Sequence, residues 1–240
     1  MPMIEIRKLT KTFGLNPVLR GVDLDVERGQ FLALLGPNGS GKTTLLRILA
    51  ALARPTGGTV RIGGWDLPAE ADFVRAQLGV VSHLPLLYDT LTAEENLLLF
   101  ARLYDLPADQ RRERVNAVLE RVGLARRARD VVRTFSRGMQ QRLAIARATL
   151  HDPAILLLDE PYTGLDQDAA ALLDMLLHEV AVGGRTIVMT THDLRRGHAL
   201  ADRITILSRG KIAFDAACAD TDPDALPALY ADVTGAAATR

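Results

Sequence analysis

Cysteine is almost absent from this sequence, since Cys218 is the single one among 240 residues. An intramolecular disulfide is therefore excluded, which favours a protein of the reducing cytosol. No histidine lies near Cys218 in the sequence. We therefore expect Cys218 to be an inert small side chain rather than a nucleophile.

The sequence also has no apolar run close to the roughly 20 residues that a membrane-spanning helix requires. At the N-terminus, Glu5, Arg7 and Lys8 occupy positions where a signal peptide would have an apolar core. If the protein acts at a membrane, we expect it to do so through a partner.

An excess of charge of one sign is missing as well, because 29 Lys and Arg residues balance 29 Asp and Glu residues. Proteins whose main partner is nucleic acid are more often basic, so this balance argues against nucleic acid as a partner. The length fits one α/β domain or two closely packed lobes with an ample core.

What the sequence does contain is a glycine-rich run that reads Gly36-Pro37-Asn38-Gly39-Ser40-Gly41-Lys42-Thr43-Thr44. It lies between an apolar strand pattern at 31–35 and an amphipathic helix pattern at 45–49, the order that a phosphate-binding loop needs. Its glycines let backbone N–H groups point at phosphates, and the new helix adds its positive end. Lys42 can reach the β- and γ-phosphates, and the Thr43 hydroxyl can bind Mg²⁺. We expect this protein to bind a nucleoside triphosphate.

Two acidic residues follow a second apolar strand pattern at 155–158, as Asp159 and Glu160. Asp159 suits the ligand sphere of Mg²⁺, directly or through water. Glu160 is expected to orient the attacking water or to accept its proton, which favours hydrolysis over binding alone. His192 lies in the polar C-terminal end of another strand pattern at 186–193, so it would lie at the same edge of a parallel sheet and bond the γ-phosphate or the water.

The rest of the chain alternates between strand and helix patterns. Alternation at 4–6 and 22–26 predicts strands, and residues 204–214 predict a hairpin around Arg209-Gly210. Residues 92–122 contain two helix patterns, the first opened by a capping box at Thr92. We therefore expect a helical lobe at about 84–150, inserted between strands of the nucleotide core.

In this order, the phosphate loop, the segment Phe135-Ser136-Arg137-Gly138-Met139, the Asp159-Glu160 strand and His192 resemble the ATP-binding subunit of ABC transporters. The resemblance runs from about 4 to 215. It implies an α/β fold: a P-loop NTPase (RecA-like) parallel-sheet core with an N-terminal antiparallel β-layer and the inserted helical subdomain. One ABC ATPase domain would then occupy 1–215, and 216–240 would form a short C-terminal tail.

The resemblance also implies partners. Family members pair head to tail, so the signature motif of one subunit closes over ATP held by the other, where a helix N-terminus stabilises phosphate charge. Ser136 and Gly138 match that motif, whereas Arg137 and Met139 depart from its usual Leu-Ser-Gly-Gly-Gln. We expect ATP and Mg²⁺ as cofactors, a homodimer, integral-membrane transporter subunits, no nucleic acid, and a peripheral location on the cytoplasmic face of the inner membrane.

Other residues take their expected roles from the same resemblance. Glu160 matches the catalytic glutamate, His192 the switch histidine, and Asp166 the acidic loop that communicates across the dimer. Phe13 matches the adenine-stacking aromatic, although packing in the β-layer is an equal alternative. Where the family has a glutamine that touches Mg²⁺, this chain has His83 or Leu84, and a protonated histidine is a poor metal ligand.

The apolar segment 84–88 has two interpretations: it borders the groove that receives a coupling helix from a membrane subunit, or it is buried within the helical lobe. The local sequences at 82–83, 86–97 and 135–142 resemble those of the haem-exporter ATP-binding subunit of cytochrome c maturation. A multidrug or lipid exporter ATPase is the alternative. A soluble ABC ATPase of translation or DNA repair is less favoured, because such proteins usually fuse two cassettes or carry long coiled-coil insertions. A kinase or GTPase would leave the Ser136 segment unexplained.

Overall fold

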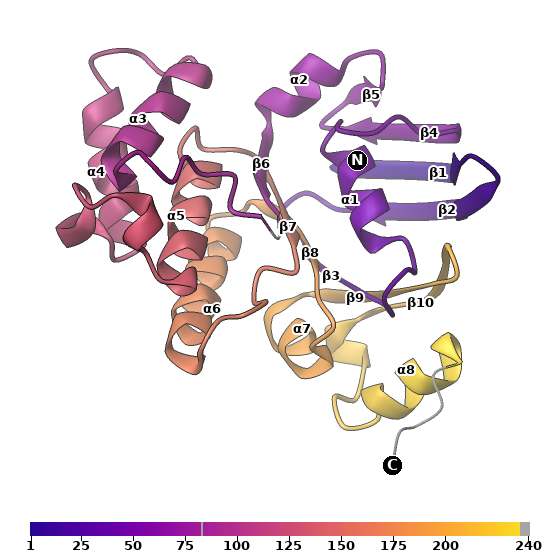
Figure 1. Cartoon of the computed structure of the whole chain (residues 1–240). Helices are drawn as coiled ribbons and strands as arrows, with labels where there is room; N and C mark the ends of the chain where they lie inside the picture. Colours follow the sequence, from indigo (N-terminus) through magenta and orange to yellow (C-terminus); the bar gives the residue numbers. More distant parts are fainter. Residues whose placement is uncertain (83, 236–240) are drawn as a thin grey trace.

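A computed structural model of the chain describes residues 1–82 and 84–235. Within these residues the strands form two sheets, one antiparallel and one mainly parallel (Figure 1). The antiparallel sheet has the order β2-β1-β4-β5, with bounds Ile4–Phe13 (β1), Asn16–Val26 (β2), Gly57–Ile62 (β4) and Trp65–Leu67 (β5). The expected strands at 4–6 and 22–26 are confirmed, because Ile4 pairs with Val26 and Ile6 with Leu24.

The second sheet has the order β10-β9-β3-β8-β7-β6. Its strands are Phe31–Leu35 (β3), Leu78–Val81 (β6), Ile155–Asp159 (β7), Thr186–Thr190 (β8), Arg203–Ser208 (β9) and Lys211–Ala217 (β10). Strands β3, β6, β7, β8 and β9 run parallel, and β10 pairs antiparallel with β9. This confirms the hairpin around Arg209-Gly210, where both residues have positive φ. It also confirms the parallel core with an N-terminal antiparallel layer.

Both faces of the central strands are covered, which explains why β3, β7 and β8 are apolar without alternation. Successive side chains point to opposite faces, so Leu157 and Val188 pack toward helix α1 and the antiparallel sheet. Leu156 and Met189 pack on the other face, toward α5, α6 and α8. Each fully buried Leu or Val contributes about 1.5–3 kcal/mol relative to exposure.

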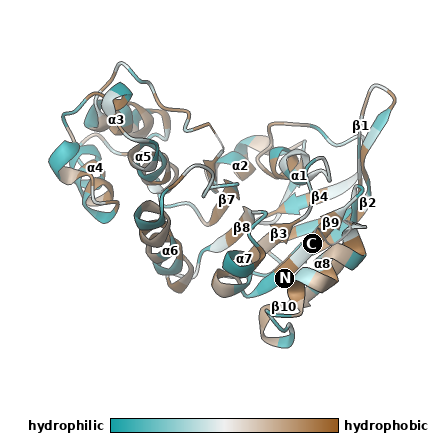
Figure 2. Cartoon of the chain, turned by 60° about the horizontal axis from the view of Figure 1, so that its bottom comes forward, coloured by the Kyte–Doolittle hydropathy of each residue, from teal (hydrophilic) through white to brown (hydrophobic). Residues whose placement is uncertain are grey.

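The helices of the described residues have the bounds Lys42–Leu49 (α1), Ala71–Ala76 (α2), Ala93–Leu103 (α3), Arg111–Arg121 (α4), Arg137–Thr149 (α5), Gln167–Val182 (α6), Leu194–Leu200 (α7) and Leu226–Thr234 (α8). Short 3₁₀ turns lie at Ala125–Arg127, Val132–Thr134 and Cys218–Asp220. In Figure 2, α3 and α4 carry both hydrophilic and hydrophobic residues, as amphipathic helices do. None of the described helices is both long and apolar enough to cross a bilayer.

Helices α3, α4 and α5 lie between β6 and β7 in the chain and share a core cluster of their own, which includes Leu97, Val118 and Leu143. Helix α5 also packs Ala144 and Ala148 against the parallel sheet. Helix α5 therefore belongs both to the helical cluster and to the layer that covers the parallel sheet. The division of the chain into a nucleotide core and a helical lobe at 84–150 stays a prediction. Thr92 closes the expected capping box with Glu95.

The expected boundary after 215 falls inside β10, and the chain beyond it packs on the core. Leu226 at the start of α8 is fully buried against the parallel sheet. Cys218 is buried as well, and burial raises the pKa of its thiol to about 11, so it is protonated at neutral pH.

Register brings three strand ends together at one edge of the parallel sheet. Thr190 at the end of β8 pairs with Leu34 of β3 on one side and with Asp159 of β7 on the other. The segments that follow these strands, which begin at Gly36, Glu160 and Thr191, therefore leave the sheet side by side. Ligands of open α/β sheets bind at this edge.

Candidate functional site

The glycine-rich loop connects β3 to α1 in a conformation that requires its glycines. Gly36, Gly39 and Gly41 have φ of 152°, 78° and 112°. A Cβ atom at Gly36 would lie 2.2 Å from the Leu207 carbonyl oxygen, and one at Gly41 would lie 2.8 Å from Leu19 Cδ2. The close approach of the loop to β2 and β9 therefore excludes side chains at these two positions.

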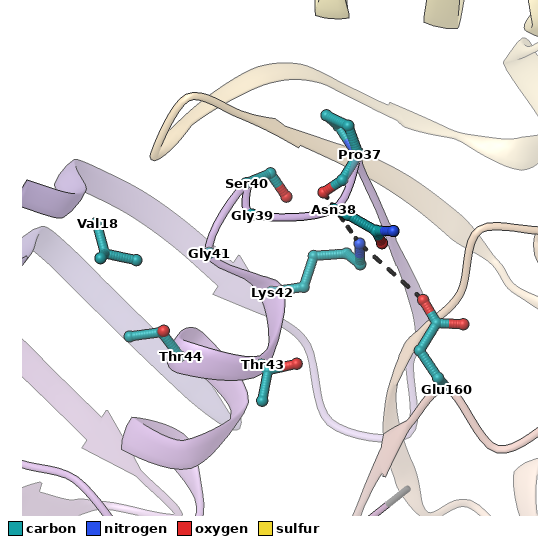
Figure 3. Close-up of a pocket in the computed structure, with 10 residues that line it drawn as sticks. All are labelled: Val18, Pro37, Asn38, Gly39, Ser40, Gly41, Lys42, Thr43, Thr44 and Glu160. Carbon is teal, nitrogen blue, oxygen red and sulfur yellow. Dashed lines mark hydrogen bonds and ion pairs between the residues drawn. The ribbon is translucent and has the colours of Figure 1, made fainter.

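This loop encloses a pocket of about 350 Å³ together with the segment after β7 (Figure 3). Apart from Gly36, the whole predicted run from Pro37 to Thr44 lines it. The lining residues are Val18, Pro37, Asn38, Gly39, Ser40, Gly41, Lys42, Thr43, Thr44 and Glu160. The structure thus places the predicted phosphate-loop residues and the predicted catalytic glutamate around one cavity.

Lys42 lies between the loop and Glu160, as Figure 3 shows. Its Nζ donates to the Gly36 carbonyl at 2.6 Å and the Pro37 carbonyl at 3.3 Å, and lies 4.0 Å from Glu160 Oε1. Burial lowers the pKa of Lys42, and the negative charges of Glu160 and Asp159 oppose that change. The ammonium group thus has anionic and carbonyl acceptors on both sides of the pocket.

A phosphate group fits this cavity on two observations. The Ser40 hydroxyl is buried and has no hydrogen-bond partner among the described residues. The N-terminus of α1 opens into the same loop, and no acidic residue occupies its first turn. An orphan hydroxyl and free backbone N–H groups beside a lysine are groups that phosphate oxygens satisfy.

Asp159 ends β7 and is 8% exposed. Its Oδ1 lies 3.3 Å from the Thr43 hydroxyl and accepts a hydrogen bond from the Thr190 hydroxyl at 2.7 Å. A carboxylate and a hydroxyl at the mouth of a phosphate loop are oxygen ligands that suit Mg²⁺. Within the described residues, no cluster of three or more His, Cys, Asp or Glu side chains offers a complete metal site. These two residues therefore fit a Mg²⁺ ion whose other ligands come from phosphate and water.

Glu160 leaves the strand with an unusual backbone conformation. Its φ is 50°, and its N–H donates to the Thr190 carbonyl at 3.2 Å and the Thr190 hydroxyl at 3.0 Å. Its Oε2 lies 2.8 Å from His192 Nδ1. The structure thus brings the two predicted catalytic side chains into direct contact, with the His192 side chain 73% exposed and facing solvent.

Ser136, Gly138 and Asp166 lie together in a different place. They line a pocket of about 240 Å³ that shares no lining residue with the phosphate-loop pocket. Ser136 caps α5 by accepting from the Met139 N–H at 3.3 Å, and Asp166 caps α6 by accepting from the Ala169 N–H at 2.8 Å. Within one chain, Ser136 therefore does not line the phosphate-loop pocket.

Phe13 lies outside the phosphate-loop pocket, and 52% of its surface is exposed. The Lys11 ammonium lies 4.7 Å from its ring centroid. Its packing inside the β-layer, the alternative raised by the sequence, is therefore wrong, because the side chain at this end of β1 reaches solvent. Stacking of Phe13 on adenine stays a prediction.

The predicted metal contact at His83 lies outside the described residues. Leu84 borders a third pocket, of about 360 Å³, which Glu160 and Arg137 also line. Leu84, Leu86 and Tyr88 are each more than half exposed. Burial of the whole 84–88 segment in the helical lobe is therefore wrong. Leu87 packs against the helical cluster, and the half-exposed Tyr88 ring lies with its centroid 6.4 Å from that of Phe100 on α3.

Sequence reasoning missed two residues of the site. Val18 lines the phosphate pocket from β2, and no local pattern marks it. Thr190 contacts Asp159 and Glu160, and its signal was a hydroxyl at the end of an otherwise apolar strand.

Comparison with known proteins places this geometry in a family. A model of the ABC transporter family matches residues 19–163. The Nod factor export ATP-binding protein I of Ralstonia nicotianae is 38% identical over 210 residues, which cover 88% of this chain and 65% of that protein. The daunorubicin resistance ATP-binding protein DrrA3 of Streptomyces coeruleorubidus is 40% identical over 202 residues, covering 84% and 64%. This chain thus spans somewhat less than two thirds of the length of these relatives.

The fold has solved counterparts. A dimeric ATP-binding cassette in a post-hydrolysis state, bound to ADP and Pi, superposes with a TM-score of 0.82 at 31% identity. The match covers 90% of this chain and 99% of that one. The chain therefore belongs to the ABC transporter family, as an ATP-binding subunit with the ABC ATPase fold.

Proposed function

We propose that this chain hydrolyses MgATP in a head-to-tail homodimer and thereby drives an exporter formed with membrane subunits. The observation that carries the proposal is one pocket that Lys42 and Thr43 of the phosphate loop line together with Glu160. That pocket combines phosphate binding with a base for water, which a mere nucleotide-binding loop lacks.

Each residue has a distinct task in this proposal. Lys42 and the loop N–H groups hold the β- and γ-phosphates, and Thr43 and Asp159 hold Mg²⁺, which neutralises phosphate charge when bound. Glu160 orients the attacking water or takes its proton. His192 contacts the Glu160 carboxylate through Nδ1 at 2.8 Å, and its exposed side chain would bond the γ-phosphate or the attacking water.

The second copy completes the site. Ser136 and Gly138 lie on a pocket apart from the phosphate loop, so a partner chain must supply them. The N-terminus of α5, which Ser136 caps, would add its positive end to the γ-phosphate. The solved relative described as dimeric supports this arrangement.

The exposed apolar segment around Leu84, Leu86 and Tyr88 is the proposed contact with membrane subunits, at the cytoplasmic face of the membrane. It adjoins Glu160 through the pocket that Leu84 borders, so a docked subunit could sense the state of the site.

For the transported molecule, the relatives favour the alternative over the first interpretation. Their names refer to Nod factor export and daunorubicin resistance, which supports a multidrug or lipid exporter. The interpretation as a haem exporter rests only on the resemblance of short sequence segments, and neither of these names supports it. Deletion of the gene separates the two: loss of c-type cytochromes, seen by haem staining, would restore the haem interpretation, whereas sensitivity to amphiphilic drugs with normal cytochromes supports the alternative.

The activity itself is tested with purified protein, Mg²⁺ and ATP. Glu160→Gln should bind ATP as the unaltered chain does and lose nearly all hydrolysis, because glutamine cannot accept a proton. Lys42→Ala should lose ATP binding in a calorimetric titration. Undiminished hydrolysis by Glu160→Gln, or no uptake of MgATP by the unaltered chain, would overturn the proposal.

A further inference from the structure

Thr190 is a fully buried hydroxyl at the C-terminal end of β8, where the preceding side chains Ile187, Val188 and Met189 are apolar. A buried hydroxyl is costly unless it is hydrogen-bonded. The Thr190 Oγ1 lies 2.7 Å from Asp159 Oδ1 and 3.0 Å from the Glu160 backbone nitrogen, and the Leu158 carbonyl is a more distant acceptor at 3.5 Å.

Strand geometry sets this position. Thr190 lies two residues after Val188, and Asp159 lies two residues after Leu157 on the neighbouring strand. Val188 and Leu157 both pack toward α1, so Thr190 and Asp159 point to that same face. Because Thr190 pairs with Asp159 in the parallel register, the two side chains are neighbours beneath the phosphate loop.

The direction of the two hydrogen bonds is fixed by chemistry. A backbone N–H can only donate, so the Thr190 oxygen accepts from Glu160. Its single proton goes to the Asp159 carboxylate at 2.7 Å rather than to the Leu158 carbonyl at 3.5 Å, because the shorter bond to an anionic acceptor is the stronger one. The Thr43 hydroxyl approaches the same Oδ1 at 3.3 Å. Among the described residues both of these hydrogen bonds go to Oδ1 of Asp159, and Oδ2 receives neither of them.

We propose that Thr190 is a positioning residue that orients Asp159 toward Mg²⁺ and fixes the start of the Glu160 turn. This inference rests on the proposed function. It predicts that removal of the Thr190 hydroxyl weakens Mg²⁺ binding, which a general loss of packing in the strand would not do selectively. Partners that orient a metal-binding carboxylate typically change metal affinity or activity by about 10- to 100-fold when they are removed.

The test compares Thr190→Val, which keeps shape and removes the hydroxyl, with Thr190→Ser, which keeps the hydroxyl. Thr186→Val is the matched control, because Thr186 begins the same strand, is 1% exposed, and its hydroxyl accepts from the Gly29 N–H at 2.9 Å away from the site. In Thr190→Val the Glu160 N–H retains the Thr190 carbonyl at 3.2 Å, so the turn keeps one of its two bonds.

ATP binding is measured calorimetrically with Mg²⁺ titrated in and with EDTA, beside steady-state hydrolysis. We expect Thr190→Val to need about 10- to 100-fold more Mg²⁺ for the same ATP binding and for half-maximal hydrolysis. Binding in EDTA should match the unaltered chain, since the phosphate loop is intact. Thr190→Ser and Thr186→Val should keep the unaltered Mg²⁺ requirement.

A folded Thr190→Val with an unchanged Mg²⁺ requirement would overturn the inference and leave the proposed function standing. An equal shift in Thr186→Val would overturn it too, because the effect would then be one of strand packing. If Thr190→Val does not fold, Thr190→Ala against Thr190→Ser makes the same comparison. Absence of Mg²⁺-dependent ATP binding in the unaltered chain would overturn the proposed function together with this inference.

Discussion

Single buried polar residues tie the helical layer to the parallel sheet. Arg147 of α5 is 5% exposed and donates to the Val80 carbonyl at 2.6 Å and the Leu86 carbonyl at 3.0 Å. Burial lowers the pKa of its guanidinium, which stays charged because arginine titrates far above neutral pH. One residue thus joins the end of β6 to the exposed apolar segment.

His151 gives a prediction at this scale. Its Nε2 bonds the Leu78 carbonyl at 3.1 Å, and its ring stacks on Tyr104 at 4.0 Å. Burial lowers the pKa of His151 below 6.5, so in acid the unfolded chain binds a proton that the folded chain does not. Stability should therefore fall as the pH drops below about 6.5. Thermal unfolding at about pH 7.5 and about pH 5.5 should show a smaller drop for His151→Phe than for the unaltered chain, and equal drops would contradict this.

Helix starts carry function at the next scale. Helices α5 and α6 begin at Ser136 and Asp166, whose side chains cap them and also line one pocket. Gly138 keeps these two helices close, because a Cβ there would lie 2.9 Å from Ala169 Cβ. Between Ser136 and Gly138, Arg137 packs over Gly164, where a Cβ would lie 2.8 Å from the guanidinium.

Removing the cap of α5 separates stability from dimerisation. Ser136→Ala should cost about 0.5–2 kcal/mol of stability, measured by urea unfolding. Thr92→Ala is the matched control, because Thr92 caps α3 in the same way and lies on another element. Only Ser136→Ala should also weaken ATP-dependent association, measured by light scattering. If both variants weaken association equally, the role of Ser136 at the partner's site is contradicted.

On the scale of the whole molecule, the two halves of the proposed site line different pockets of one chain, so the proposal requires a second copy for hydrolysis. Glu160→Gln with MgATP should accumulate as a dimer, because binding proceeds and turnover stops. Size-exclusion chromatography with light scattering measures this. Lys42→Ala under the same conditions should stay monomeric, and a Glu160→Gln protein that remains monomeric at saturating ATP would contradict the head-to-tail site.

The exposed apolar segment around Leu84, Leu86 and Tyr88 is the proposed contact with a membrane subunit, which gives a prediction for the whole molecule. Leu86→Glu combined with Tyr88→Glu should leave ATP binding intact and move the protein from the membrane to the soluble fraction of its cells. Val182→Glu, at an even more exposed apolar residue of α6, should keep the membrane fraction unchanged. Retention of the double variant on membranes would show that docking occurs elsewhere.

The sequence by itself determined the phosphate loop, the acidic pair after β7 and the alternation of strands and helices, because these depend on neighbouring residues and on strand or helix periodicity. Tertiary structure alone decided that Thr190 bonds Asp159, that Phe13 and Tyr88 reach solvent, and that α8 packs on the core. Those facts depend on strand register and on which surfaces meet, and residues far apart in the chain set both. Motifs made of neighbouring residues can therefore be identified from the sequence, whereas the contacts and exposure of their side chains depend on how the sheet and helices pack.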